Sequence, residues 1–147
     1  MAADAEQRRA LRDRAGLALI DAAPQGWLRI DFRCRAVVEV HDATLSVLLN
    51  DGSYPAVPVP QEAVDALLRL RSAMYEPGEG TWFSARYLID PPGRLHANYN
   101  LDFNPRWEPG IAPEGWVRDL EAFPRDAEHI PGWLRAELAR ARQGEAQ

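Results

Sequence analysis

Lysine is absent from this sequence of 147 residues, and all 17 basic residues are arginine. Cysteine occurs once, at Cys34, which excludes an internal disulfide. No run of hydrophobic residues approaches the roughly 18 that a membrane-spanning helix requires. The N-terminus also lacks the basic and then apolar order of a signal peptide. We therefore expect a cytoplasmic protein with no membrane partner.

Charge and hydrophobic content narrow the class of protein further. The formal net charge is -5, which argues against a broad phosphate-binding surface and hence against a nucleic-acid partner. Hydrophobic residues make up 46% of the chain, a share typical of a globular protein. The length fits one domain, which we assign to residues 1–147, with residues 1–3 and 143–147 as disordered tails.

The first half of the chain predicts a helix followed by a strand meander. Helical spacing of apolar residues marks residues 4–22. Apolar and polar residues alternate from Trp27 to Val40. This run is too long for one straight strand, so we expect a bend or bulge near residues 34–36. There follow a turn at 41–43, a strand at 44–49, a hairpin turn at 50–52 and an edge strand at 53–59.

The second half predicts a helix, a hairpin and two further helices. The helices are expected at 60–74, at 114–122 and from about 131 to 142. The hairpin turns at 90–93, and its second strand directs Leu95, Ala97, Tyr99, Leu101 and Phe103 inward. The whole order predicts an α+β fold: an antiparallel β-sheet, made of the meander plus the hairpin, covered by N-terminal, central and C-terminal helices.

Motifs that carry catalytic chemistry are missing from the sequence. Cys34 lies on the apolar register of its strand and is expected in the core. The three histidines lack the spacing of a metal site, and neither a Gly-x-Ser-x-Gly elbow nor a glycine-rich phosphate loop occurs. The calcium-like run Asn100–Asn104 fails because proline and isoleucine occupy the sixth and twelfth positions. We expect no enzyme activity, no metal and no cofactor.

One polar strand face leaves an alternative open. His96 shares that face with Arg94, Asn98, Asn100 and Asp102, and Ser84 and Arg86 lie across the hairpin. Such a face is more often simply solvated, but the same residues can form a small-molecule or catalytic pocket around His96.

The segment between Leu101 and Ile130 combines carboxylates with aromatic residues. Only three arginines oppose its acids, and Trp116 and Phe123 fall at near-helical spacing, which favours packing. For Trp107, a position in the core and a position in an interface are equally supported. Aromatic anchors with an acidic rim are typical of surfaces that bind basic protein partners. The expected partner-binding residues are Asp102, Trp107, Glu108, Glu114, Asp119, Glu121, Asp126 and Glu128.

Three stretches of the chain carry a resemblance to a known family. They are MYEPGEGTWFSARY at 74–87, DPPGRLHANYNLD at 90–102 and FPRDAEHIPGWL at 123–134. With them the chain, from about Trp27 to Leu138, resembles the YezG-like family, in particular its actinobacterial branch. That resemblance implies an immunity protein, or antitoxin, of a bacterial polymorphic toxin system, with an α+β fold and no catalytic residues.

The implied partner is a cognate toxin domain, such as a nuclease or an NAD-degrading toxin. The sequence departs from the family at Asn98–Asp102, where asparagines and a leucine replace an expected aromatic and acidic stretch. This departure implies a different target or an orphan immunity protein. Two hypotheses follow: a stoichiometric toxin inhibitor, and a small-molecule-binding or catalytic domain built on the His96 face.

Overall fold

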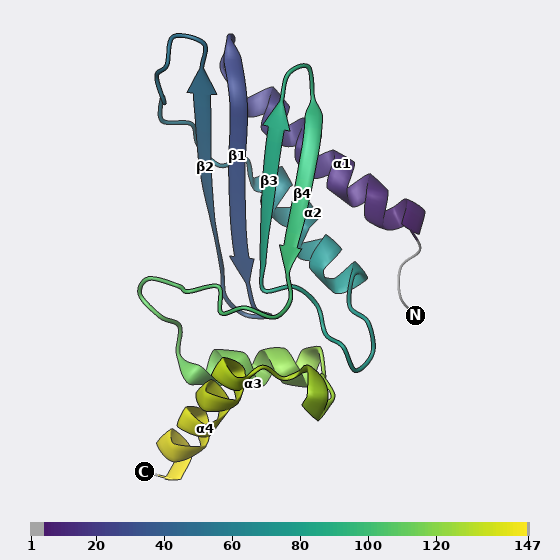
Figure 1. The fold of residues 1–147 in the computed structure, drawn as a ribbon, viewed down its shortest axis with the longest axis vertical. Coiled ribbons are helices and arrows are strands. Elements are labelled where there is room, and N and C mark those ends of the chain that lie inside the picture. The colour runs from purple at the N-terminus through teal and green to yellow at the C-terminus, as the bar shows by residue number, and fades with distance from the viewer. Residues whose placement is uncertain (1–4, 147) are drawn as a thin grey trace.

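The computed structural model of this protein describes residues 5–146. Four strands form one sheet in the order β2-β1-β3-β4, and every neighbouring pair is antiparallel (Figure 1). The predicted α+β fold is confirmed. The elements are α1 (Ala5–Ala22), β1 (Trp27–Ala36), β2 (His41–Leu49), α2 (Gln61–Ala73), β3 (Ser84–Asp90), β4 (Arg94–Asn100), α3 (Pro113–Ala122), the 3-10 helix η1 (Ala127–His129) and α4 (Gly132–Ala146).

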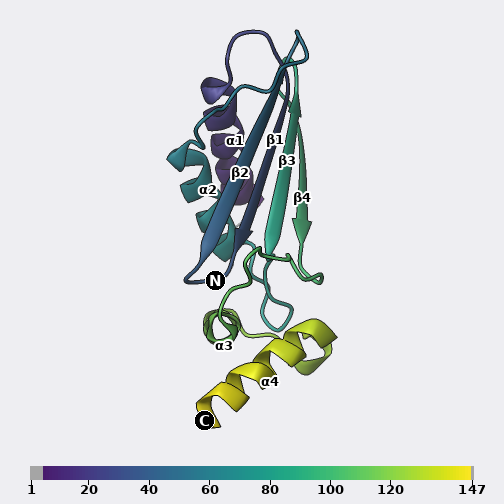
Figure 2. The ribbon, with the colours of Figure 1, turned by 90° about the vertical axis from the view of Figure 1, so that its left-hand side faces the viewer.

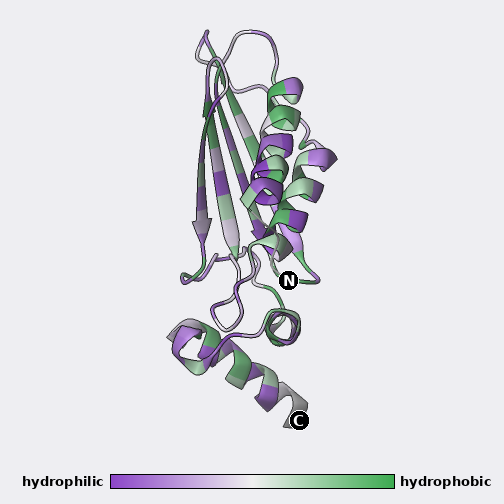
Figure 3. Ribbon diagram, turned by 90° about the vertical axis from the view of Figure 1, so that its right-hand side faces the viewer, coloured by the Kyte–Doolittle hydropathy of each residue, from purple (hydrophilic) through white to green (hydrophobic). Residues whose placement is uncertain are grey.

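Helices α1 and α2 cover one face of the sheet and leave the other face open (Figure 2). Alternation along the strands produces this layering, because successive side chains point to opposite faces. Ile30, Phe32 and Cys34 of β1 are fully buried under the helices, which confirms the core position of Cys34. Figure 3 shows the same alternation as hydrophobic and hydrophilic segments along the strands.

Helices α3 and α4 lie beyond one end of the sheet (Figure 1). A second hydrophobic cluster includes Trp116 of α3 and Leu134 of α4. Its buried members are Val37, Phe83, Trp107, Trp116 and Leu134. Aromatic rings meet edge to face here: the Trp116 centroid lies 5.7 Å from Phe83 and 5.1 Å from Trp133. Among the described residues, no helix has the length and apolar content needed to cross a membrane.

The β1–β2 turn differs from the sequence prediction. The turn occupies residues 37–40, where the Val37 amide donates to the Val40 carbonyl at 2.8 Å, and His41 already belongs to β2. Val37 is buried in the second cluster, so packing at the end of the sheet stops the strand despite the continuing alternation. The expected bulge near 34–36 is also wrong, because the register shifts between Trp27 and Arg29 instead.

Three further predictions are corrected. Residues 53–59 form no strand, since the prolines at 55 and 58 cannot donate ladder hydrogen bonds. Phe103 is 77% exposed, because the Asn100 side-chain oxygen accepts from the Phe103 amide at 2.9 Å and turns the chain away from the sheet. Residues 143–146 continue α4, whereas the predicted tail at 1–3 and residue 147 lie outside the described residues.

Candidate functional site

Asp119, predicted to contact a partner, is part of the protein interior. Its carboxylate accepts two hydrogen bonds from the Arg71 guanidinium, each 2.8 Å long, and both side chains are at most 4% exposed. Arg71 also donates to the Trp82 carbonyl at 2.6 Å. The prediction for Asp119 is therefore corrected: this acid joins helix α3 to helix α2 and presents no charge at the surface.

Trp107 is also interior, which settles the choice between core and interface. The residue is 8% exposed and packs 5.7 Å from Trp116, measured between ring centroids. Arg35 lies over the Trp107 ring at 5.7 Å and donates to the Arg106 carbonyl at 2.7 Å. These contacts fix the connector between β4 and α3, residues 101–112, onto the end of the sheet, so Trp107 is removed from the predicted partner-binding set.

The other predicted acids lie on the surface. Glu114 is half-buried, and the exposed members are Asp102, Glu108, Glu121, Asp126 and Glu128. Buried Arg125 brings three of them together: its guanidinium donates to the Leu101 carbonyl at 2.8 Å and to the His129 carbonyl at 3.0 Å. Asp102 therefore lies beside the segment that carries Asp126 and Glu128.

A groove of about 750 Å³ runs between the connector and helices α3 and α4. Phe103 stands at its edge with 77% of its surface exposed. The charged lining side chains are balanced, with Glu108 and Glu137 against Arg106 and Arg140. The groove thus offers aromatic surface, and the exposed acids Asp102, Glu121, Asp126 and Glu128 lie outside its lining.

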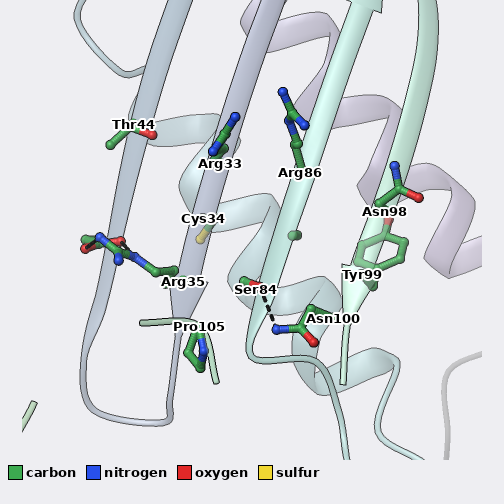
Figure 4. A pocket seen from close by; sticks show the side chains of 12 residues that line it. Arg33, Cys34, Arg35, Thr44, Ser84, Arg86, Asn98, Tyr99, Asn100 and Pro105 are labelled. Carbon is green, nitrogen blue, oxygen red and sulfur yellow. Dashed lines mark hydrogen bonds and ion pairs between the residues drawn. The ribbon is translucent and has the colours of Figure 1, made fainter. Parts of the chain in front are cut away.

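The open face of the sheet carries a second concave region, a pocket of about 460 Å³ (Figure 4). Its lining includes Arg33, Arg35, Arg86, Asn98 and Asn100, from three strands. His96 does not line it: its Nε2 atom lies 4.0 Å from the Asp90 carboxylate, on an exposed side chain. The expected face therefore contains a pocket, but its charged groups are arginines and the histidine stands outside.

Ion pairs organise the arginines of this pocket. Arg35 donates to both carboxylate oxygens of Asp42 at 2.9 and 2.6 Å. Arg86 donates to both oxygens of Asp31 at 3.1 and 2.9 Å. The Arg86 hydrogen bond, with a smaller contribution from Arg33, lowers the pKa of Asp31 against the opposing effect of burial. Asp31 is thus held as a carboxylate shared by two guanidinium groups.

Reactive groups are few near either region. Cys34 is fully buried, and burial raises the pKa of its thiol from 9.0 to about 12, so the thiolate that acts as a nucleophile is disfavoured at neutral pH. Within residues 5–146, no group of three or more histidine, cysteine, aspartate or glutamate side chains is arranged to hold a metal ion.

Sequence reasoning named Arg86, Asn98 and Asn100 for this face but missed Arg33 and Arg35. Arg33, Arg35 and Arg86 are visible as polar residues of alternating strands, but only the register brings Arg33 opposite Arg86. Comparison of the chain with protein-family models and with curated proteins finds no match. The resemblance to the YezG-like family therefore stays a prediction.

Proposed function

We propose that this protein is an immunity protein that binds and blocks a protein toxin domain, acting in the cytoplasm. The carrying observation is Phe103, a phenyl ring 77% exposed on a turn held by Asn100. It adjoins Asp102, whose backbone is fixed to α4 by a 2.8 Å hydrogen bond from the Trp133 indole. We call Phe103 together with Asp102, Glu121, Asp126 and Glu128 the Phe103 surface.

The chemistry of the Phe103 surface suits a basic protein partner. An exposed aromatic ring gains free energy when docking removes it from water, and such rings are frequent anchors of protein interfaces. Carboxylates around it accelerate association with a positively charged partner. A nuclease toxin must attract phosphates, so a basic cleft is the complementary surface. An NAD-degrading toxin can be occluded in the same way with less dependence on charge.

Rigidity supports this assignment. The Phe103 turn and the 126–129 segment are tied by Arg125, whose guanidinium also donates to the Thr81 carbonyl at 2.9 Å. A prearranged surface loses less conformational freedom on binding, which favours tight complexes. We further propose that the chain has no catalytic turnover, so inhibition is stoichiometric.

Co-expression with the toxin domain encoded beside this gene tests the proposal. The wild type should restore growth, whereas Phe103→Ala and the double variant Glu121→Arg with Glu128→Arg should lose most of this rescue. The double variant Glu62→Arg with Asp65→Arg, on the exposed side of α2, is the control with the same change of charge. Circular dichroism should show all variants folded. Failure of the wild type to rescue, or full rescue by every variant, would contradict the proposal.

A further inference from the structure

One row of side chains crosses all four strands on the open face of the sheet. The strand registers pair Thr44 with Arg33, Arg33 with Arg86, and Arg86 with Asn98. These four residues, here called the arginine row, line the 460 Å³ pocket (Figure 4). Neighbouring strands lie about 4.8 Å apart, so the row spans roughly 14 Å, the length of a small organic molecule.

The arginine row carries a positive charge that the protein leaves uncompensated. Arg33 and Arg86 stand directly opposite each other, an arrangement of like charges that destabilises a sheet. Both depend on the one carboxylate of Asp31. Arg86 takes it bidentately, and the nearest Arg33 nitrogen remains 3.5 Å away. Arg33 therefore has only one long ion pair, through one of its nitrogens, and the two arginines together exceed the one carboxylate that they share by one positive charge.

The two ends of the row are free hydrogen-bonding groups. Among the described residues, neither the Asn98 carboxamide nor the Thr44 hydroxyl has a hydrogen-bond partner. The next row towards α3 differs, because there Arg35 is paired with Asp42 and the Asn100 amide donates to the Ser84 hydroxyl at 3.1 Å. Unused donors and acceptors are thus confined to one row of the pocket.

We infer that the arginine row binds a small organic anion, through a carboxylate or a phosphate group held by Arg33 and Arg86. A guanidinium presents its N–H donors in a planar fork that matches the oxygens of both groups. Asn98 and Thr44 then hydrogen-bond the neutral polar atoms of the same ligand. An anion compensates the free charge of Arg33 and removes the repulsion between the two arginines.

This inference goes beyond toxin binding and needs no toxin for its test. No residue of the Phe103 surface lines the pocket, and the four residues of the arginine row make no hydrogen bond to that surface, although Asn100 of the neighbouring row holds the Phe103 turn. Loss of one activity therefore leaves the other measurable.

Two-dimensional NMR of the purified protein, titrated with inorganic phosphate and separately with acetate at constant ionic strength, provides the test. Amide shifts should saturate and centre on Arg33, Arg86 and Asn98 with at least one probe. The better probe identifies the preferred anionic group. Arg33→Gln should weaken that binding by about tenfold or more, as loss of a charged hydrogen bond implies.

Arg69→Gln is the matched control, because Arg69 is an exposed arginine on α2, in the layer behind the sheet. It should bind the probe as the wild type does. Asn98→Asp adds a negative charge to the row and keeps the side-chain size, so this variant should lose binding of the probe. Absence of saturable shifts with both probes would overturn the inference, and so would equal affinity of the wild type and a folded Arg33→Gln variant.

Discussion

Arg71 and Asp119 lie 48 residues apart in the chain and form a buried, bidentate ion pair between helices α2 and α3. Thr81 adds to it by donating its hydroxyl hydrogen to the Arg71 carbonyl at 2.6 Å. This pair connects the core under the sheet to the aromatic cluster at its end. The Phe103 surface belongs to that end of the molecule, so its position depends on this link between α2 and α3.

Replacing Asp119 by asparagine should destabilise the protein strongly. The variant leaves the Arg71 guanidinium buried without a counter-charge, and breaking such a pair costs about 3–5 kcal/mol. Urea unfolding followed by tryptophan fluorescence measures the loss. Glu121→Gln, an exposed acid on the same helix, should change stability by less than about 0.5 kcal/mol. A loss below about 1 kcal/mol for Asp119→Asn would mean that Arg71 finds another partner.

Gly80→Ala should be more harmful than Gly52→Ala, although both glycines have left-handed backbone angles, φ +97° and +85°. A Cβ at Gly80 collides with the Arg125 side chain, which is held by three carbonyls. A Cβ at Gly52 meets no described atom within 4 Å, so only the cost of the φ angle remains. Thermal unfolding of the two variants checks this, and equal melting temperatures would contradict the wedged position of Arg125.

Burial of Cys34 should make the free energy of unfolding depend on pH in the alkaline range. The unfolded thiol ionises near pH 9.0, whereas burial raises the native pKa to about 12. Above pH 9 the unfolded state therefore releases a proton that the native state retains, and stability falls as pH rises.

The effect can be isolated by comparing wild type with Cys34→Ala. The free energy of unfolding of the wild type minus that of Cys34→Ala should be constant below pH 8. Above pH 9 this difference should fall by about 1.4 kcal/mol per pH unit. Native protein should also react slowly with a bulky thiol reagent at pH 8. Rapid labelling would place the thiol at the surface and refute its burial.

Trp107 and Phe103 should respond in opposite ways to truncation. Trp107→Ala opens a cavity in the second cluster and should cost about 3–5 kcal/mol. Phe103→Ala removes an exposed ring and should leave stability within about 0.5 kcal/mol of wild type while weakening the toxin complex. Chemical unfolding and calorimetric binding separate the two effects. Unchanged affinity of Phe103→Ala would remove this ring from the interface.

Local patterns predicted the α+β class and most of the elements correctly, whereas the strand expected at 53–59 does not form. The β3–β4 hairpin followed from strict alternation and its Asp90–Gly93 turn, although its second strand ends at Asn100, and the central helix followed from its apolar spacing. The position of the β1–β2 turn was not predicted by the local pattern. Val37 is buried in a cluster formed by distant residues, and this burial ends the strand although the alternation continues.

The candidate sites depend on contacts between segments that are distant in the sequence. Local sequence patterns do not predict such contacts. In the sequence Asp119 is one of seven acids between Leu101 and Ile130, and only the structure places Arg71 beside it. Trp107 faces the interior because Trp116 and Phe83 converge on the same cluster. The arginine row required the register of four strands, since a shift of one residue would move Arg33 to the opposite face.

Hydrogen–deuterium exchange of the protein, alone and with the toxin domain encoded beside its gene, tests the central claim most directly. A stable complex should form in which amides of residues 101–104 and 121–129 become protected, whereas those of the open-face strands β1 and β3 exchange as in the free protein. Absence of a complex would contradict the immunity function. Protection confined to β1 and β3 would contradict the Phe103 surface as the site of contact.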